Sequence, residues 1–416
     1  MNRKIFRPSN LAAATALAAI SCAAMADVVD FVFLGCSPSG VNDSGKVVMT
    51  CGADELLRRY NRPDYWETIQ KPLACRAGAL ANNGTAFAHC TSNGQQRAYV
   101  WLAQQSDLIA LLPALGHDRA TVSAVSPSGV AVGATIDSQG RSYPALWRST
   151  TARATELKVG LLGLGGRNCV ASNVEDENTV NPAVVGSCPI SSSTRRTAIV
   201  WRRNGLLINY VAHALPFPHQ SDDCKADLIA GNSVVGTCQF IAGTPRHPGI
   251  YTVAWVGNDE PKVMTPDGGP SDSHPIGVLK DGSIAGYVRH NDGEIGDRAF
   301  IWRPANDDLT IFSATLDPDH PEAGVVPLHY SESGFLVGTA QVVVTESGET
   351  EVVTKPFRLT VSTGTMINVG APIDPSNGPE TVTAVSRDGC FAAGTMTFGP
   401  LEYNNRSFLY RMCGSK

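Results

Sequence analysis

The chain has 416 residues and a formal net charge of −5, and it holds no block of lysine and arginine. Without such a block we expect neither nucleic acid nor an anionic membrane as its partner. Its 40 glycines, its many valines and threonines and the lack of helical periodicity favour an all-β chain.

The first 26 residues predict a secretory signal peptide. Three basic residues precede a short apolar stretch at 11–20, and Ala24-Met25-Ala26 forms a cleavage site. A lipoprotein signal with Cys22 as the lipidated residue is the alternative. The apolar stretch is too short for a transmembrane helix, and no other apolar run is long enough. Removal of the three basic residues with the signal leaves a net charge of −8. Residues 27–416 are predicted to form one domain, either periplasmic or secreted.

Residues 121–147 define a unit that recurs along the chain. Apolar residues alternate on both sides of the turn Ser126-Pro127-Ser128-Gly129, which predicts a β-hairpin. Gly133 is expected where another backbone segment approaches closely, near a crowded propeller axis. A third strand ends at Trp147, and a fourth is expected to follow it. Four strands in each repeat of roughly 40–50 residues are typical of β-propellers.

Eight copies of this hairpin align along the chain. They lie at residues 36–51, 75–90, 121–135, 169–188, 224–238, 275–288, 327–340 and 381–396. The third strands of the first six copies are expected to carry the six tryptophans, Trp66, Trp101, Trp147, Trp201, Trp255 and Trp302, followed by Leu359 and Tyr410 in the last two. A large side chain at this position fills the wedge between adjacent blades.

The predicted fold is therefore a single β-propeller, with eight four-stranded blades as the main prediction and seven as the alternative. The chain stops on the third strand of its last repeat, around residues 407–413. An apolar strand at residues 28–34 is expected to complete that blade and close the ring, because an open ring would leave sheet edges unpaired.

Ten cysteines remain outside the signal, and they pair locally in sequence. The predicted disulfides are Cys36–Cys51, Cys75–Cys90, Cys169–Cys188, Cys224–Cys238 and Cys390–Cys413. Residues opposite each other across a hairpin have Cβ atoms about 4.5–5.5 Å apart, close to disulfide range. Five local disulfides indicate an oxidising compartment. A metal site is the rival interpretation, but the CxxC and CxxH spacings of such sites are absent, so neither a metal nor a cofactor is predicted.

The repeat resembles the HAF-type extracellular repeat of bacterial secreted proteins. The matches are AVSPSGVAVGA at residues 124–134, RAYVW at 97–101 and RAFIW at 298–302. The histidine that gives the repeat its name is replaced by arginine or another residue. The resemblance covers nearly the whole chain after the signal. It implies a propeller-like β fold and an extracytoplasmic location, and it implies no particular activity.

Candidate site residues lie in the connections that lead into the first strands of several blades. They are His117, Asp118, His219, Asp222, Asp272, His274, Asp319 and His320. Converging on one mouth of the channel, such groups would suit a cation, a sugar or a partner. The plainer interpretation is a set of solvated turns.

No catalytic motif is found, and the glutamates are too scattered to suggest a glycosidase pair. The expected function is a non-enzymatic extracytoplasmic propeller that binds a protein partner, for example a periplasmic immunity or inhibitor protein. The alternatives are a carbohydrate-active propeller enzyme, either lyase or hydrolase, and a structural module of the envelope.

Overall fold

The computed structural model describes residues 27–29, 35–52, 56–62, 65–69, 74–103, 105, 107–159, 168–175, 180–190, 195–203, 210–241, 248–257, 259–265, 271–290, 296–320, 322–346, 349–371, 373, 378–397 and 405–413. Within these ranges all regular structure is β-strand and no helix occurs. The described residues therefore contain no helix that could cross a membrane.

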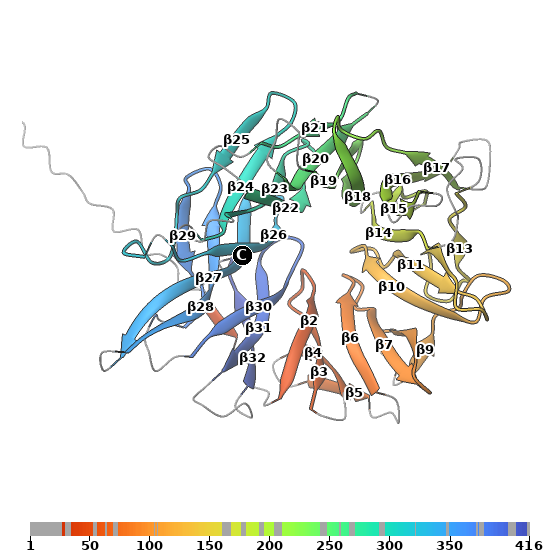
Figure 1. Ribbon diagram of the computed structural model, residues 1–416. Helices are drawn as coiled ribbons and strands as arrows, with labels where there is room; N and C mark the ends of the chain where they lie inside the picture. The colour runs from red at the N-terminus through yellow and green to blue at the C-terminus, as the bar shows by residue number, and fades with distance from the viewer. Residues whose placement is uncertain are drawn as a thin grey trace, which may run out of the picture.

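The strands form eight four-stranded antiparallel sheets around a common axis (Figure 1). The first four sheets are β2 (Cys36–Val41), β3 (Val47–Cys51), β4 (Leu56–Arg62), β5 (Tyr65–Ile69); β6 (Ala74–Leu80), β7 (Ala86–Ser92), β8 (Gln95–Trp101), β9 (Leu108–Ala110); β10 (Arg119–Val125), β11 (Ala131–Ile136), β12 (Ser142–Trp147), β13 (Thr155–Glu156); β14 (Val170–Val174), β15 (Val184–Pro189), β16 (Arg196–Arg203), β17 (Tyr210–Ala214).

The remaining four sheets follow the same order from the axis outward. They are β18 (Ser221–Ala230), β19 (Ser233–Phe240), β20 (Gly249–Val256), β21 (Lys262–Val263); β22 (Ser271–Val278), β23 (Ile284–His290), β24 (Arg298–Arg303), β25 (Asp308–Ile311); β26 (Val325–Tyr330), β27 (Phe335–Glu346), β28 (Glu349–Thr360), β29 (Thr365–Asn368); β30 (Glu380–Val385), β31 (Phe391–Thr397), β32 (Asn405–Arg411), β1 (Asp27–Val29).

The N-terminal strand closes the ring, as predicted. β1 pairs antiparallel with β32, so that Val28 lies opposite Tyr410. The last blade is thus built from both ends of the described chain, and β2 of the first blade packs against β30 and β31. Residues 30–34, which the prediction included in this strand, lie outside the described residues.

The buried core lies between neighbouring blades, and large third-strand side chains fill it. Trp201 packs with Val132 and Leu146 of the preceding blade, and Trp255 packs with Val185 and Val200. Trp101, Trp147, Trp302, Leu359 and Tyr410 take the same position in their own sheets. The prediction of a wedge-filling residue in the third strand is confirmed for these sheets.

Trp66 is the exception. It lies in the fourth strand of its sheet, β5, and not in the third as predicted. The third strand, β4, has Tyr60 opposite Val47, which is the register that Trp147 has opposite Ala131 in the third blade. The alignment error arose because the first repeat holds Tyr60 and Trp66 only six residues apart, so both suited the aromatic position.

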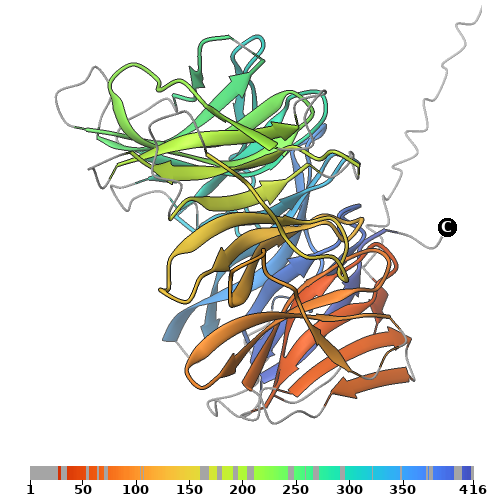
Figure 2. The same ribbon diagram turned by 90° about the vertical axis from the view of Figure 1, so that its right-hand side faces the viewer.

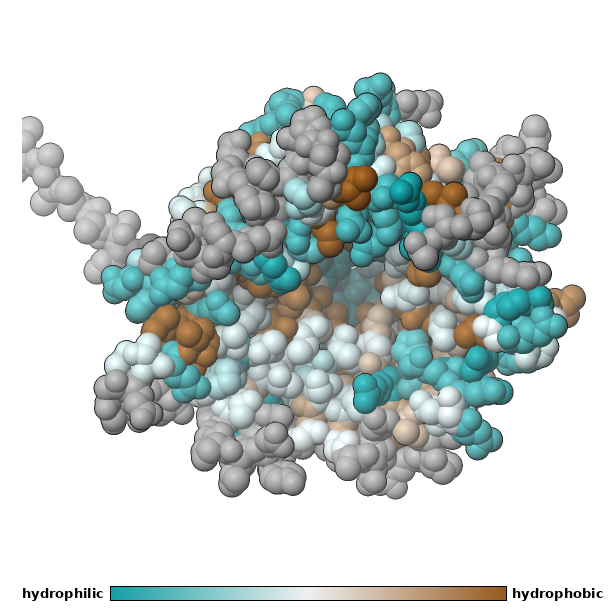
Figure 3. All heavy atoms as spheres, in the orientation of Figure 1, coloured by the Kyte–Doolittle hydropathy of each residue, from teal (hydrophilic) through white to brown (hydrophobic). Residues whose placement is uncertain are grey.

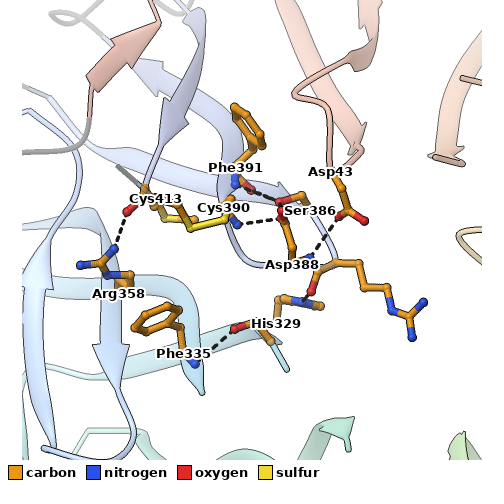
Figure 4. Close-up of a disulfide and its surroundings, with 12 residues drawn as sticks. Asp43, His329, Phe335, Arg358, Ser386, Asp388, Cys390, Phe391 and Cys413 are labelled. Atoms are coloured by element: carbon orange, nitrogen blue, oxygen red, sulfur yellow. Dashed lines mark hydrogen bonds between the residues drawn. A yellow bond between two sulfur atoms is a disulfide. The ribbon is translucent and has the colours of Figure 1, made fainter. Parts of the chain in front are cut away.

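All five predicted disulfides are present. Three of them join residues directly opposite each other in a hairpin, such as Cys224 and Cys238. Cys169–Cys188 lies one residue beyond the Val170–Ser187 pair, and Cys390–Cys413 ties the last strand to the turn before β31 (Figure 4). Such a set of disulfides is consistent with an extracytoplasmic location.

A β-bulge interrupts the first strand of every blade. In β10 the register shifts between Val122 and Ala124, and the same shift recurs in six other first strands. In β6 the shift is larger, between Ala77 and Leu80. Close to the bulge the Thr121 carbonyl oxygen lies 2.1 Å from where a Cβ on Gly133 would be. The close approach predicted at Gly133 is confirmed, although the neighbouring strand causes it and not the channel axis.

Candidate functional site

The two ends of the propeller carry different connections. We call one end the turn face; it carries the turns between the first and second strands of each blade. We call the opposite end the connection face; there the fourth strand of each blade leads into the first strand of the next. Figure 2 shows the blades of the ring from the side. The candidate residues expected from the sequence all lie on the connection face.

The histidines expected on the connection face make contacts within their own neighbourhood. His117 Nδ1 lies 2.6 Å from Thr135 Oγ1, and the ring stacks on Tyr143. His274 stacks on Tyr287, and burial lowers the pKa of His274. His320 pairs with Glu322 at 2.9 Å, and His219 is exposed.

Two of the four carboxylates expected there tie blades together. Asp272 Oδ1 accepts a hydrogen bond of 2.8 Å from the backbone N–H of Ile250 in the preceding blade. Asp222 forms an ion pair of 3.2 Å with Arg195. Asp118 and Asp319 are exposed.

Among the eight candidates, the charge of Asp272 acts on His274 and that of Asp319 on His320, each pair within one blade. No hydrogen bond or ion pair among the described residues joins candidates of different blades, so their use as one site stays a prediction. No group of three or more His, Cys, Asp or Glu among the described residues is placed to hold a metal ion.

The turn face is organised by hydrogen bonds between successive turns. The Asp43 carboxylate accepts bonds from Asn82 Nδ2 at 2.6 Å and from the Asp388 backbone N–H at 3.1 Å. Asn82 N–H in turn donates to the Pro127 carbonyl at 2.9 Å. The turns of four neighbouring blades are thereby held together on one side of the channel.

A cavity of about 210 Å³ opens on the other side of this face. Five blades line it, through the turn-proximal ends of their first strands and the turns themselves. Its ionisable residues are Glu175, Lys280, His329, Glu332 and Arg387. In the view of Figure 3 the surface is hollowed near the middle of the ring.

The bulges select the residues that line this cavity. A bulge shifts the alternation of a strand and redirects the side chains beyond it. The residues directly after the bulges are Gly40, Leu80, Ala124, Asn173, Leu228, Gly277, His329 and Ala384. Four of them line the cavity, and His329 is the only ionisable residue of the eight.

His329 has a defined tautomer. Its Nε2 lies 2.8 Å from the Arg387 carbonyl oxygen, which can only accept, so Nε2 carries the proton. Burial lowers the pKa of His329, although the bond to Arg387 and the charges of Asp43 and Asp388 partly oppose this shift. The ring is therefore neutral near pH 7, and Nδ1 keeps its lone pair. Nδ1 has no hydrogen-bond partner among the described residues. Figure 4 shows His329 beside the turn of Asp388.

The groups around His329 carry both signs of charge. Arg387 Nη2 forms a half-exposed ion pair of 3.4 Å with Glu332 Oε1. Lys280 lies exposed at the tip of its turn, and Glu175 accepts a bond of 3.1 Å from the Ala183 N–H. Close packing forms the wall, since a Cβ on Gly277 would lie 2.9 Å from Tyr330 Cβ. The cavity thus offers a neutral base, two cations and two carboxylates.

Sequence reasoning missed this cavity, although a signal for it exists. The repeat from 327 to 340 reads PLHYSESG where other copies have glycine, alanine, leucine or asparagine at the position of His329. Comparing the copies position by position would have singled out this histidine. The turn residues were instead interpreted only as turn formers.

Comparisons of the whole chain find the fold among solved structures only. No protein-family model matches the sequence, and no curated protein matches it. An oligopeptidase B from Leishmania major matches with a TM-score of 0.52 and 11% identity, over 90% of this chain and 54% of that one.

Two further structures match less closely in shape. A Mycobacterium tuberculosis puromycin-hydrolyzing peptidase has a TM-score of 0.47 and 13% identity, over 91% of this chain and 60% of that one. An oligogalacturonate lyase from Vibrio parahaemolyticus has a TM-score of 0.48 and 8% identity, over 92% of this chain and 98% of that one. This chain spans less than two thirds of either peptidase.

These matches correct the expected function. We expected a non-enzymatic propeller that binds a protein partner, whereas the oligopeptidase B that matches with a TM-score of 0.52 is an enzyme. That expectation is therefore not retained. At these low identities the likeness itself shows the β-propeller fold and assigns no substrate, so the chemistry has to be argued from the cavity.

Proposed function

We propose that this protein is a carbohydrate-active enzyme, and specifically a lyase that cleaves uronate-containing glycans in the cavity of the turn face. The observation that carries the proposal is His329, a neutral imidazole in a cavity also lined by Arg387 and Lys280. Its Nδ1 has no hydrogen-bond partner within the part of the chain that the structure describes. A lyase needs a base for a carbon-bound proton and cations that neutralise the uronate carboxylate.

The step is a β-elimination. His329 Nδ1 removes the proton from the carbon next to the uronate carboxylate, and the electrons of that bond form a double bond to the neighbouring carbon. The bond from this neighbouring carbon to the glycosidic oxygen breaks, and the leaving oxygen takes a proton from water. Arg387 and Lys280 stabilise the negative charge that develops on the carboxylate.

Three features of the site suit this step. The bond from Nε2 to the Arg387 carbonyl holds the ring in the tautomer that leaves Nδ1 free. The lowered pKa keeps the base unprotonated at neutral pH. The planar guanidinium of Arg387 can bind a carboxylate with two hydrogen bonds. Its ion pair with Glu332 is exposed, so the substrate carboxylate can replace that of Glu332.

A glycoside hydrolase is the second candidate, because two carboxylates, Glu175 and Glu332, line the same cavity. Hydrolases commonly use such a pair as acid and as base or nucleophile. In this reading His329 only supports the site.

The test is a screen of oligosaccharides derived from pectate, alginate and glycosaminoglycans, together with neutral glucans. A lyase yields an unsaturated sugar that absorbs ultraviolet light, and a hydrolase yields new reducing ends without that absorbance. We expect the unsaturated product from wild type and from Glu175→Gln, and none from His329→Ala. Cleavage of neutral glucans that is lost in Glu175→Gln would favour the hydrolase, and no cleavage of any glycan would refute both.

We further propose that the protein acts in the periplasm or after release from the cell. The five disulfides, the signal-like residues 1–26 and the resemblance to HAF-type repeats support this location. Fractionation of cells that express the full chain, followed by N-terminal sequencing, tests it. Recovery of uncleaved protein in the cytoplasm would contradict it.

A further inference from the structure

We infer that the substrate is an oligosaccharide of several units, which extends from the cavity of the turn face into a groove between two blades. This inference rests on the proposed function and adds a second binding region to it. The groove lies between the blade of β16 and β17 and the blade of β19 and β20, and its volume is about 390 Å³.

The groove and the cavity meet at one turn. The turn between β18 and β19 contains Gly231 and Asn232, which are adjacent in the chain. Gly231 lines the cavity, whereas Asn232 lines the groove. Arg202 belongs to the groove, and its Nη2 lies 3.4 Å from the Gly231 carbonyl oxygen at this boundary. A chain that leaves the cavity between these blades therefore enters the groove directly.

The lining of the groove suits a sugar chain. Leu215 supplies partly exposed apolar surface, and the almost fully buried Val200 and Trp255 lie behind it. The Trp255 indole is fixed by a bond of 2.8 Å to the Pro216 carbonyl. Polar groups stand at its margins, namely Arg202, His213, Asn232 and Asp259. Sugars present apolar ring faces and hydroxyl edges, which such a combination binds.

Arg202 gives the groove its preference for acidic units. It is half-buried, and its guanidinium can bind a uronate carboxylate with two hydrogen bonds. The groove is also larger than the cavity, about 390 against 210 Å³. When the reacting uronate lies beside His329, the next sugar units of the chain would lie over the β18–β19 turn and beside Arg202.

The experiment measures kcat/KM, from the disaccharide to the hexasaccharide, on oligosaccharides of the uronate glycan that the screen finds to be cleaved. We expect kcat/KM to rise with chain length by roughly tenfold or more, as one added charged contact would allow. Arg202→Ala should remove this gain and leave the disaccharide unchanged, while Arg202→Lys should keep part of it because only the bidentate geometry is lost. Arg289→Ala removes an arginine from the connection face and is the matched control.

Two outcomes would overturn the inference while the lyase proposal stands. In the first, kcat/KM does not depend on the length of the oligosaccharide. In the second, Arg202→Ala lowers kcat/KM on the disaccharide as much as on longer chains. If no uronate oligosaccharide of the screen is cleaved, the lyase proposal fails, and calorimetry with the same uronate oligosaccharides decides on the groove. Binding that strengthens with oligosaccharide length and weakens in Arg202→Ala supports the groove. No binding, or binding that depends on neither the length nor Arg202, refutes it.

Discussion

The turn face and the connection face both carry histidines and carboxylates, but these groups are engaged to different degrees. On the connection face His117 contacts Thr135 and Tyr143, and Asp272 accepts a backbone bond from the neighbouring blade. On the turn face His329 uses one ring nitrogen to fix its orientation and keeps the other unpartnered among the described residues. The difference separates side chains that are engaged in structural contacts within or between blades from one that can act on a ligand.

If this comparison is right, variants of the two faces should fail in different ways. Changes on the turn face should reduce activity with little effect on stability. Changes on the connection face should alter stability and leave turnover intact. The predictions below test this division, beginning with the largest expected effect.

His329→Ala should lower kcat by about 10²–10⁴-fold, the usual contribution of a general base. The melting temperature should change little, because the ring makes a single hydrogen bond with the described residues, to the Arg387 carbonyl. The measurement is initial rates of unsaturated-product formation, with circular dichroism as the check on folding. His117→Ala, on the connection face, is the matched control and should keep wild-type rates. Equal losses in both variants would remove the distinction between the faces.

Lys355→Met should destabilise the fold by about 3–5 kcal/mol, because it strands a buried carboxylate. Lys355 Nζ lies 3.1 Å from Glu380 Oε1, and both side chains are almost fully buried at the connection face, between the last two blades. Tyr410 OH also donates to Glu380, at 2.8 Å. Burial, followed by the Glu380 charge, raises the pKa of this tyrosine far above its ordinary value.

Urea unfolding of wild type and Lys355→Met measures this loss. The double variant Lys355→Met/Glu380→Leu is the control and should recover much of the stability, since it removes the stranded charge. Turnover of the folded protein should stay at the wild-type value in both. A stability within experimental error of wild type for Lys355→Met would show that the pair does not hold the closing blades.

Asp272→Ala should cost about 1–3 kcal/mol, because a partly buried backbone donor loses its bond to a charged acceptor. The donor is the Ile250 N–H of the preceding blade, 2.8 Å from Asp272 Oδ1. Asp272→Asn keeps an acceptor oxygen and should lose much less. Thermal melting of both variants, with activity measured at a lower temperature, tests the prediction. A drop in kcat/KM without a drop in stability would instead place Asp272 in a functional site.

The fold was largely predictable because its determinants are local and repeated. Alternating apolar residues around a turn and cysteines at paired hairpin positions act within a single blade, and one wedge-filling residue per repeat acts only on the adjacent blade. Cys224 and Cys238 are opposite each other for this reason. Trp66 was misplaced because two aromatic residues compete within one repeat.

The cavity was not predictable in the same way, because it depends on register and on ring closure. The bulge between Pro327 and His329 moves the following residue to a new side of the strand, and apolar alternation gives no sign of that shift. Residues of five blades then meet only after the ring has closed. Glu332 and Arg387 are 55 residues apart in sequence and meet as an ion pair at the turn face.

Activity should fall on the acid side by about tenfold for each pH unit below the pKa of His329. Burial lowers this pKa, so the midpoint should lie below about 6.5, the ordinary value of histidine. The charged groups that act on the ring are Asp43, Asp388 and Arg387. Asp388→Asn removes a negative charge that favours the protonated ring, and should move the midpoint to still lower pH. A midpoint above that of free histidine would exclude His329 as the base.

The smallest effect is expected at His320 on the connection face, and it concerns stability alone. The hydrogen bond to Glu322 raises the pKa of His320, and the pair is exposed. A raised folded pKa means that the pair stabilises the fold below about pH 6.5, the unfolded value, and loses this contribution as the pH rises through the folded pKa. The partner acts in the opposite sense. The pKa of Glu322 is lowered, so its contribution disappears as the pH falls through its folded pKa.

His320→Gln should therefore lower the melting temperature slightly at mildly acidic pH and leave it unchanged at alkaline pH, with wild-type turnover at both. Thermal melts at about pH 5.5 and about pH 8.5, on either side of the histidine titration, provide the measurement. Together with the acid limb assigned to His329, this gives each face its own pH response. On the turn face the response is in the rate, because a ring nitrogen is left to accept a proton from the substrate. On the connection face it is in the stability, because the ring is already paired. A loss of turnover in His320→Gln would show that the connection face takes part in the reaction, and the division between the two faces would have to be abandoned.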